Sequence, residues 1–597
     1  MSKWFLKSNR ADTALMAKSL GINEITAYVM ANRGVRTRAE AMDWLNPEDG
    51  PFFDESLLRD ADRAAAIIAE ATAGGVKIAV YGDYDVDGVV STYMLYSSLK
   101  RYGADAVYFV PHREKDGYGL NINAINALAG EGVGLIITCD NGISALEEID
   151  LAVNSLGLGI VVIDHHEITK GPAGEDILPA AGAVINPKRA DCMYPYKNLC
   201  AAAVCYKFLK YFHKYLGLDF DEDEEFLALA ALASVCDMVE IRSETRAIIR
   251  AGLRLLSEKP LNPGLSALIR EKELAGRRLT VFDLGFLLGP CINAAGRLHS
   301  ADLSVELLLA ADEDAAAPLA RKLRELNDER RALTGASVEN ALKNIAASQN
   351  GFGEKIIVYF DENIHESLAG IVAGRVRETV HRPAVVLTWS QGFIKGSARS
   401  TDGYNIYEGL NACRDLFIKF GGHEAAAGMS LAEENLDEFR RRLNENCSLT
   451  EDDFAQVYRI EKEIRLSDVT FSLAKELKIF EPHGNGNPEP LFATKAAAPE
   501  RCEIIGESRK TLRFLFPTED GRRSVKGICF NRADDFVEMI RPAFAENVIN
   551  KFLDGSLKNL AFLMDMIYRV EINEYNGNEY LQIRLVDFRL SEKGALK

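Results

Sequence analysis

The sequence predicts an α/β protein with a parallel-sheet domain, a long connector helix, a smaller α/β domain and a C-terminal β-barrel. From Val76 onward, short apolar runs such as VKIAVY, LIITC and GIVVI alternate with helical stretches, which indicates βαβ units and a parallel sheet covered on both faces. The stretch 313–347 has Glu/Arg pairs at helical spacing and few bulky apolar residues, as a connector helix would. Beyond about 456, alternating strand patterns and a turn at Asn576-Gly577 are typical of a small barrel.

A chain of 597 residues has room for about three to four domains. Changes in pattern divide it into an N-terminal helical arm, a parallel-sheet domain, the connector helix, a second α/β domain and the barrel. The expected limits are 1–50, 51–312, 313–347, 348–447 and 456–597 respectively. Within the arm, Thr37 and Glu40 have the spacing of a capping box at the start of a short helix.

Composition excludes several classes of protein. Hydrophobic residues make up 47% and charged residues 26%, values typical of a folded globular protein. No apolar run approaches the roughly 18 residues that a membrane span needs, and the N-terminus lacks a signal-peptide core. The 10 cysteines include no CxxC pair and indicate buried thiols in a reducing cytosol, so we expect a cytoplasmic protein. The net charge of −18 means that any nucleic-acid contact must be local.

Acidic and imidazole side chains follow three of the predicted strands at the point where each strand ends. They are Asp83, Asp85 and Asp87 after VKIAVY, Asp140 after LIITC, and Asp164, His165 and His166 after GIVVI. Because the carboxyl ends of parallel strands meet at one edge of a sheet, we expect these side chains to converge. Carboxylates this close repel each other, and divalent cations relieve the repulsion. Oxygen ligands with an imidazole favour two ions of Mn²⁺ or Mg²⁺ over structural zinc.

Two other interpretations of these residues compete with a metal site. Asp83, Asp85 and Asp87 match the opening of an EF-hand loop, but its twelfth position is Met94 instead of Glu and a strand precedes it. A single aspartate after a strand is usually a loop or helix-cap residue, whereas three such strand ends together favour a site. Asp237 ends the apolar run FLALAALASVCDMV, and its pattern alone leaves open whether it is a ligand.

These motifs, in this order, resemble those of the DHH phosphoesterase superfamily, and within it the RecJ-like single-stranded-DNA-specific exonucleases. The five DHH motifs are matched by GDYDVDG, TCDNGIS, VIDHH, ASVCDMV and CINAAGRL. The segments IHESLAGIVAGRV, KGSAR and GGHEAAAG resemble a DHHA1 domain, and EPHGNGNPEPLF with the last strands resembles an OB region. The resemblance therefore implies a catalytic DHH domain, a DHHA1 domain and an OB-like nucleic-acid-binding domain.

The resemblance also implies roles for individual residues. Six residues would hold the two metal ions: Asp83, Asp85, Asp87, Asp140, His165 and Asp237. His166 would contact the scissile phosphate, and Asp164 would orient a neighbouring imidazole. The substrate would be bound by Arg113, Tyr118, Asn293, Arg297, His365, Ser397, Arg399, Gly422 and His423, with Arg113, Arg297, Ser397 and Arg399 at the terminal 5′ phosphate. The chain departs from the family pattern at Cys291, His299 and Glu240.

The function that the resemblance implies is metal-dependent hydrolysis of single-stranded DNA, from the 5′ end to mononucleotides, in repair and recombination. A helicase and a single-strand-binding protein are the partners it suggests, and the oligomeric state stays open. Two alternatives are a short-oligonucleotide or cyclic-dinucleotide phosphodiesterase and a non-catalytic replication scaffold. The β-rich C-terminal region, with a basic excess over 501–530, favours long strands. The complete set of acidic residues disfavours a scaffold.

Overall fold

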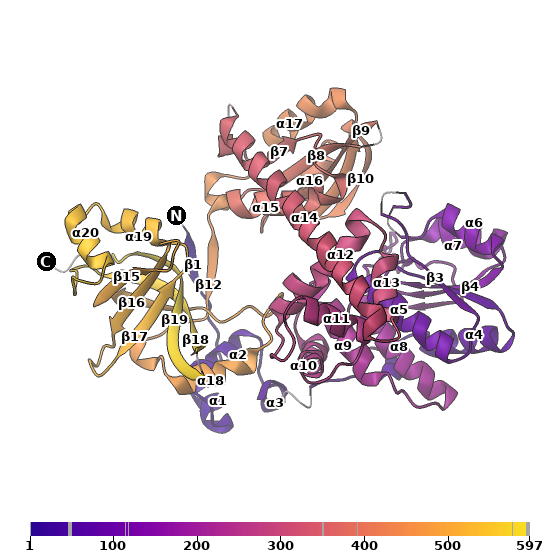
Figure 1. Cartoon of the computed structure of the whole chain (residues 1–597), viewed down its shortest axis with the longest axis horizontal. Helices are drawn as coiled ribbons and strands as arrows, with labels where there is room; N and C mark the ends of the chain where they lie inside the picture. Colours follow the sequence, from indigo (N-terminus) through magenta and orange to yellow (C-terminus); the bar gives the residue numbers. More distant parts are fainter. Residues whose placement is uncertain are drawn as a thin grey trace. The chain divides into compact units, whose positions relative to one another are not determined.

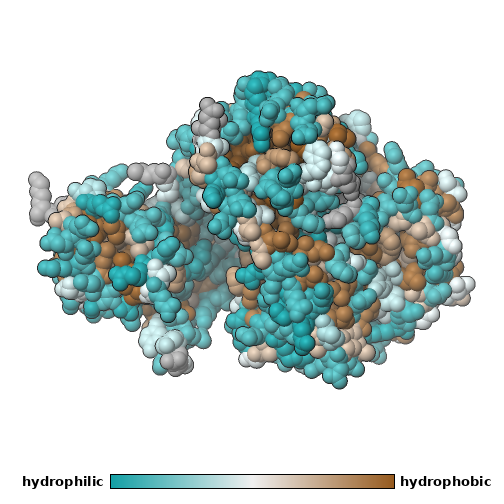
Figure 2. Space-filling view, turned by 45° about the horizontal axis from the view of Figure 1, so that its top comes forward, coloured by the Kyte–Doolittle hydropathy of each residue, from teal (hydrophilic) through white to brown (hydrophobic). Residues whose placement is uncertain are grey.

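The computed structural model describes residues 2–45, 50–113, 115–117, 119–348, 351–390, 392–575 and 577–592. The chain divides into two compact units, one of residues 51–455 and one that joins residues 1–50 to 456–597. Within the described ranges, no helix combines the length and apolar character that a membrane crossing requires. Hydrophilic side chains predominate on the face shown in Figure 2, with apolar areas between them.

The first sheet of the larger unit is parallel throughout, with the strand order β3-β2-β4-β5-β6 (Figure 1). Its strands are β2 (Lys77–Tyr81), β3 (Ala106–Phe109), β4 (Val133–Cys139), β5 (Gly159–Ile163) and β6 (Ala183–Ile185). One face packs against α4 (Ala61–Ala73), α5 (Val86–Arg101) and α8 (Ala201–Leu216), and the other against α6 (Ile122–Gly130) and α7 (Leu146–Asp150). The chain runs from β2 to β3 and then crosses to β4 on the other side of β2. The switch point of this sheet, where open α/β sheets bind ligands, therefore lies between β2 and β4.

Further helices complete this region and lead to the second sheet. They are α9 (Asp223–Cys236), α10 (Ser243–Glu258), α11 (Pro263–Glu271), the π-helix η4 (Asp283–Leu288), α12 (Gly289–Leu298), α13 (Asp302–Leu309) and α14 (Glu313–Ala347). α14 is the helix predicted over 313–347. Its first half buries Ala320 and Leu323 in the core of the parallel-sheet region, and its second half buries Ala341 and Ile345 against the second sheet. One continuous helix thus contributes to both cores.

The second sheet has the order β10-β11-β9-β8-β7. Its strands are β7 (Ile357–Phe360), β8 (Ala384–Ser390), β9 (Phe393–Arg399), β10 (Phe417–His423) and β11 (Ala426–Leu431). α15 (Ala369–Val380) packs on one face over β7 and β8, while α16 (Ile406–Asn411) and α17 (Leu436–Glu445) cover the opposite face. The α15 face over β9, β11 and β10 contributes residues to a cleft.

The smaller unit contains a seven-stranded sheet with the order β13-β14-β18-β19-β17-β16-β15. These are β13 (Lys462–Glu463), β14 (Phe492–Ala497), β15 (Arg501–Ile505), β16 (Thr511–Pro517), β17 (Ser524–Cys529), β18 (Met564–Tyr575) and β19 (Asn578–Leu590), with α18 (Phe471–Leu477), α19 (Ala533–Ile540) and α20 (Glu546–Leu553). Most neighbouring strands pair antiparallel, as the alternating pattern predicts, although β13 with β14 and β17 with β19 pair parallel.

The N-terminal segment belongs to this smaller unit. It forms β1 (Lys3–Leu6), α1 (Thr13–Leu20), α2 (Glu24–Asn32) and α3 (Arg38–Leu45). β1 pairs with β12 (Val457–Ile460), and Val29 of α2 is buried in the same cluster as Leu473. The capping box predicted for α3 is present, because the Glu40 carboxylate accepts from the Thr37 amide and the Thr37 hydroxyl accepts from the Glu40 amide. Sequence patterns predicted an arm of helices, whereas the structure adds a strand and a shared core.

Candidate metal centre and phosphate cleft

The strand-end residues predicted from the sequence come together around the switch point. Asp83 follows β2, Asp85 caps the start of α5, and Asp140 follows β4 with a left-handed backbone (φ 62°) that is uncommon outside glycine. A side chain at position 88 would collide with Asp83, because an added Cβ would lie 2.6 Å from the Asp83 Cα. Gly88 therefore allows the loop after β2 to fold onto the first turn of α5.

His165 lies at the centre of this cluster. Its Nε2 atom lies 3.2 Å from Asp140 Oδ1 and 3.7 Å from Asp87 Oδ2, and its Nδ1 atom lies 3.8 Å from Asp237 Oδ2. Three sets of possible ligand atoms each lie within 4.8 Å of one another: Asp83, Asp85 and Asp140; Asp87, His165 and Asp237; and Asp140, His165 and His166. We call these seven residues the metal cluster. Asp237 joins it from the end of helix α9, not from a strand.

Burial and mutual repulsion make the cluster unfavourable as a set of free anions. Burial, with a smaller effect from Asp85, raises the pKa of Asp83 to about 8 and that of Asp87 to about 7. Burial and then Asp87 raise the pKa of Asp237 to about 8, and the same two causes raise that of Asp140 well above its usual value. Burial lowers the pKa of His165 to about 4, so its imidazole is neutral, the form that binds metals.

Two atoms of the cluster fit metal ligation directly. Asp83 Oδ1 and His165 Nε2 are buried and have no hydrogen-bond partner among the described residues. Buried polar atoms normally have a partner, and an orphaned one marks a place that suits an ion or a water. The other nitrogen of His165 lies 3.1 Å from the Leu199 carbonyl, which orients the ring as metal-binding histidines usually require. Carboxylate oxygens with one or two imidazoles are a donor set that Mn²⁺ and Mg²⁺ accept.

Asp164 lies beneath the cluster and holds its neighbours. Its carboxylate accepts hydrogen bonds from the backbone amides of Ile143, His165 and His166, and lies 2.8 Å from His166 Nδ1. Burial alone would raise the pKa of Asp164, but the hydrogen bond and charge of His166 lower it to about 2. Burial would lower the pKa of His166, but the hydrogen bond to Asp164 raises it to about 9. The contact with Asp164 therefore favours the protonated form of His166.

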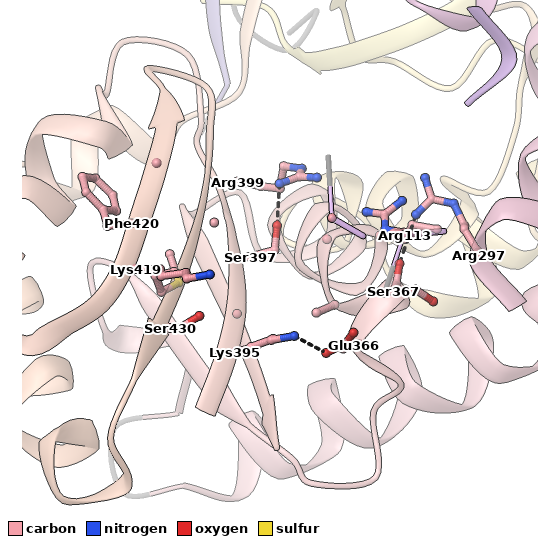
Figure 3. Close-up of a pocket in the computed structure, with 18 residues that line it drawn as sticks. Arg113, Arg297, Glu366, Ser367, Lys395, Ser397, Arg399, Lys419, Phe420 and Ser430 are labelled. Atoms are coloured by element: carbon pink, nitrogen blue, oxygen red, sulfur yellow. Dashed lines mark hydrogen bonds and ion pairs between the residues drawn. The ribbon is translucent and has the colours of Figure 1, made fainter. Parts of the chain in front are cut away.

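Four predicted phosphate-binding residues line one cleft of about 750 Å³. Arg113, Arg297 and Arg399 gather at one end of it, with Ser397 beside Arg399 (Figure 3). Arg399 donates to Ser397 Oγ at 2.8 Å, and Arg297 donates to the Ser367 carbonyl at 3.0 Å. We call Arg113, Arg297, Ser397 and Arg399 the arginine end of the cleft.

The arginine end has the electrostatics of an anion site. Burial, with a smaller effect from Arg113, lowers the pKa of Arg297 to about 10 and also lowers that of Arg399. The guanidinium of Arg113 stacks over the ring of Tyr84, 5.1 Å from its centroid. Because Tyr84 stands between two residues of the metal cluster in the sequence, the cleft and the cluster adjoin. A bound phosphate would relieve the repulsion among the arginines.

The remaining predicted substrate residues lie outside both groups. Tyr118 falls outside the described residues. Asn293 is half-buried on α12, and His365 contacts the hydroxyl of a cleft residue, with its Nδ1 2.8 Å from Ser367 Oγ. Gly422 and His423 lie on β10 beyond the cleft-lining Gly421.

Sequence reasoning missed Ser367, Lys395 and Lys419, which also line the cleft. The position of Lys395 in the sequence could have predicted its place in the cleft, because it precedes Ser397 by two residues in a strand and so shares its face. Of the departures from the family pattern, Cys291 is buried, with its thiol directed at the Leu287 carbonyl. It is not among the residues that line the cleft.

Comparisons with known proteins match this architecture. The DHH family N-terminal domain matches residues 77–234, the DHHA1 domain residues 353–449 and the RecJ OB domain residues 460–587. The single-stranded-DNA-specific exonuclease RecJ of Bacillus subtilis (strain 168) is 32% identical over 97% of this chain and 69% of its own length. The protein of the same name from Dickeya dadantii (strain 3937) is 31% identical, over 93% of this chain and 94% of its own.

Solved structures agree with these relatives. The crystal structure of RecJ in complex with Mn²⁺ from Thermus thermophilus has a TM-score of 0.81 and 26% identity, covering 99% of this chain and 80% of that one. An exonuclease RecJ bound to manganese has a TM-score of 0.57 and 30% identity, over 66% of this chain and 96% of that one. From its domains, its curated relatives and its fold, the chain belongs to the RecJ family of DHH proteins.

Proposed function

We propose that this protein is a metal-dependent exonuclease that hydrolyses single-stranded DNA from its 5′ end to mononucleotides, in DNA repair and recombination. The observation that carries the proposal is that a group of acidic residues lies next to a group of basic residues. An acidic cluster suited to cations adjoins, through Tyr84, a basic cleft suited to a phosphate. A nuclease that starts at a phosphorylated end needs both.

Two ions of Mn²⁺ or Mg²⁺ would be held by Asp83, Asp85, Asp87, Asp140, His165 and Asp237. When bound, they supply positive charge that lowers the pKa of a coordinated water and stabilises the charge of the reacting phosphate. The orphaned Asp83 Oδ1 and His165 Nε2 atoms support this ligand set. The backbone amides of Ala201 and Ala202, at the start of α8, each donate to the Asp87 carboxylate at 2.7 Å and fix its orientation.

His166 has a different role in this proposal. The Asp164 carboxylate favours the protonated ring, so His166 can offer an N–H group to the scissile phosphate. Asp164 accepts from its other nitrogen and holds the ring in place. A charged hydrogen-bond donor fixed before the substrate arrives needs little reorganisation during the reaction.

The arginine end would bind the terminal 5′ phosphate. Guanidinium groups form forked, charge-assisted hydrogen bonds to phosphate oxygens, and Ser397 adds a hydroxyl donor. With the first phosphate fixed, the length of one nucleotide would set which phosphodiester reaches the metal cluster. Such an arrangement selects a bond by distance from the end and is largely indifferent to base identity.

The test is incubation with 5′-labelled and 3′-labelled single and double strands in Mn²⁺, Mg²⁺ or chelator. We expect labelled mononucleotide from the 5′-labelled single strand at once, progressively shortened 3′-labelled fragments, and no product with chelator. Turnover of a dinucleotide that exceeds turnover of a long strand would favour a short-oligonucleotide phosphodiesterase. Absence of cleavage with either metal would favour a non-catalytic scaffold.

We also propose a cytoplasmic location and, as partners, a helicase and a single-strand-binding protein. All 10 cysteines are free thiols, which suits a reducing compartment. The partners rest on the family resemblance, and co-purification with the tagged full chain, with and without nuclease treatment, tests them directly.

A further inference from the structure

The cleft extends beyond the arginine end along the open face of the second sheet. Strand pairing places its side chains in rows across β9, β11 and β10. In the first row, Gly428 of β11 pairs with Ser397 of β9 and with Gly421 of β10. In the second row, Ser430 of β11 pairs with Lys395 of β9 and with Lys419 of β10. Because alternate residues of a strand share a face, both rows face the cleft, and two residues of strand separate them by roughly 6.6 Å.

Beside Ser397, the first row consists of Gly428 and Gly421, so this part of the cleft floor carries no side chains. A Cβ added at Gly421 would meet no atom within 4 Å, and one added at Gly428 would meet only a carbonyl oxygen at 4.0 Å. Neither glycine has a positive φ. Backbone conformation and packing therefore do not require glycine at either position. Glycine in a strand interior costs stability and often marks the close approach of a ligand.

The second row, Lys395, Ser430 and Lys419, forms a lysine end together with Glu366, and Figure 3 shows these residues below and to the left of Arg113 and Arg297. Lys395 pairs with Glu366 at 3.0 Å. Glu366 also accepts from the Ser390 hydroxyl, and these contacts keep its pKa low despite partial burial. Lys419 is exposed and has no ion-pair partner among the described residues. Because Lys395 neutralises the charge of Glu366, the positive charge of Lys419 is available to bind an anionic ligand.

We propose that the lysine end binds the additional phosphates of a 5′-diphosphate or 5′-triphosphate end, so that the enzyme also accepts strands whose first nucleotide carries a polyphosphate. This inference rests on the proposed function, in which the arginine end holds the phosphate attached to the first sugar. The second and third phosphates then extend over the glycine floor, where two phosphoanhydride links reach the lysines. A monophosphate end leaves the lysine end unused.

The reaction itself does not change. Water attacks the phosphorus of the first internucleotide phosphodiester, the bond from that phosphorus to the 3′ oxygen breaks, and the 3′ oxygen takes a proton. The first product is a nucleoside 5′-triphosphate with a free 3′ hydroxyl. The shortened strand keeps a 5′ monophosphate, so every later turnover is that of an ordinary strand.

The test compares one single-stranded oligonucleotide with a 5′ monophosphate or a 5′ triphosphate, using kcat/KM in Mn²⁺. The variants are Lys395→Ala/Lys419→Ala, which removes both lysine charges, and Gly421→Ala, which adds to the floor a Cβ that meets no atom within 4 Å. Lys343→Ala, an exposed lysine on α14 away from the cleft, is the matched control. We expect each cleft variant to lose about tenfold or more on the triphosphate strand and less than about twofold on the monophosphate strand. Lys343→Ala should change neither.

The outcomes separate this proposal from the proposed function. A wild-type enzyme that cleaves the monophosphate strand but rejects the triphosphate strand overturns the lysine-end assignment alone, as does an equal loss on both strands. If wild type cleaves neither strand, the proposed function fails. In that case, calorimetric titration of metal-free protein with inorganic triphosphate tests the lysine end separately. Equal triphosphate affinity in wild type and the double variant overturns the assignment of the lysine end. Nucleoside triphosphate that inhibits monophosphate-strand cleavage at concentrations well below the KM for the triphosphate strand would instead assign the subsite to free nucleotides.

Discussion

The metal cluster and the arginine end of the cleft are both groups of like charges, but the fold holds them in opposite ways. The carboxylates come from the edge of a sheet that is covered on both faces and from the ends of helices α5 and α9, and Asp83 and Asp140 are buried. The arginines are half-buried and line a cleft. Burial raises the pKa of Asp83 to about 8 and lowers the pKa of Arg297 to about 10. Each group therefore destabilises its own charges until a ligand of opposite sign binds.

This difference in access corresponds to a difference in ligand. A small cation can enter a buried cluster, whereas the end of a nucleic-acid strand needs an open floor. Within each of the three sets the ligand atoms lie within 4.8 Å of one another, so removing one ligand leaves its neighbours uncompensated. Donors in the cleft act more independently on a flexible phosphate. We therefore expect large, substrate-independent losses from changes in the cluster, and smaller losses from the cleft that depend on the 5′ group.

The largest effect is expected from Asp140→Asn. Asparagine is nearly isosteric and tolerates the left-handed backbone at this position, so the fold should persist while an anionic ligand is lost. Partners that merely orient a metal ligand are worth about 10-fold to 100-fold, so loss of a ligand should lower kcat on every strand by more than about 100-fold. Circular dichroism and the melting temperature check the fold. A rate within about tenfold of wild type in saturating Mn²⁺ would remove Asp140 from the metal cluster.

A smaller and substrate-dependent effect is expected from Arg399→Ala. Charge-assisted hydrogen bonds contribute about 1.5 to 3 kcal/mol, so kcat/KM on 5′-phosphorylated strands should fall by about 10-fold to 100-fold. Strands with a 5′ hydroxyl never make this contact and should lose much less. Measuring both substrates with wild type and variant gives a double difference, and equal losses on the two would show that Arg399 has another role.

The sequence predicted the metal cluster because its information is local. Apolar runs locate the strands, and the polar residues that follow them must meet at one edge. Asp237 could not be placed in this way, because it reaches His165 only through the packing of α9. Sequence patterns also could not predict that the residues of the lysine end lie together. Lys395 and Lys419 become neighbours through the register of β9, β11 and β10, which the pattern of each strand does not specify.

The association of the N-terminal segment with the C-terminal unit depends on contacts still further apart in the sequence. Thr26 donates to the Glu476 carboxylate at 2.9 Å, and the Asn23 amide donates to the same carboxylate at 2.7 Å. Helical spacing in residues 1–50 predicts that α1 to α3 form, but it does not say which surface their apolar faces bury against. Contacts of high sequence separation are the part of a fold that local patterns leave open.

Metal binding should stabilise the protein against unfolding, an effect on stability that the open cleft cannot match. Mn²⁺ at about a hundredfold over its dissociation constant adds about 2.7 kcal/mol, which is several degrees in melting temperature. Inorganic phosphate should add less, because the three arginines are only half-buried, whereas Asp83, Asp87 and Asp140 are buried. Differential scanning fluorimetry with each ion, on wild type and Asp140→Asn, tests the contrast. The same Mn²⁺ shift in both proteins would mean that the ion binds elsewhere.

The smallest effect on chemistry is expected from removing the whole smaller unit. A truncation that ends near Thr450 but keeps residues 1–50 would expose the face of α2 that buries Val29 and Met30 against the C-terminal unit. The appropriate fragment is therefore 51–455. It should fold and cleave short oligonucleotides at near the full-length rate, while binding long strands more weakly, because contacts outside the active site add affinity without chemistry.

The salt dependence of binding makes this last prediction quantitative. On single strands the slope of log K against log salt is about −0.7 for each phosphate bound, so the slope for the fragment should be shallower by that amount for every phosphate that the smaller unit binds. A second fragment, residues 1–455, checks the choice of boundary. It keeps α2 without the C-terminal unit that covers its apolar face, so we expect it to be less soluble than 51–455. Equal affinity and slope for the full chain and a folded 51–455 fragment would show that the smaller unit does not contact the strand. In that case the binding of long strands would have to be assigned to residues 51–455 alone.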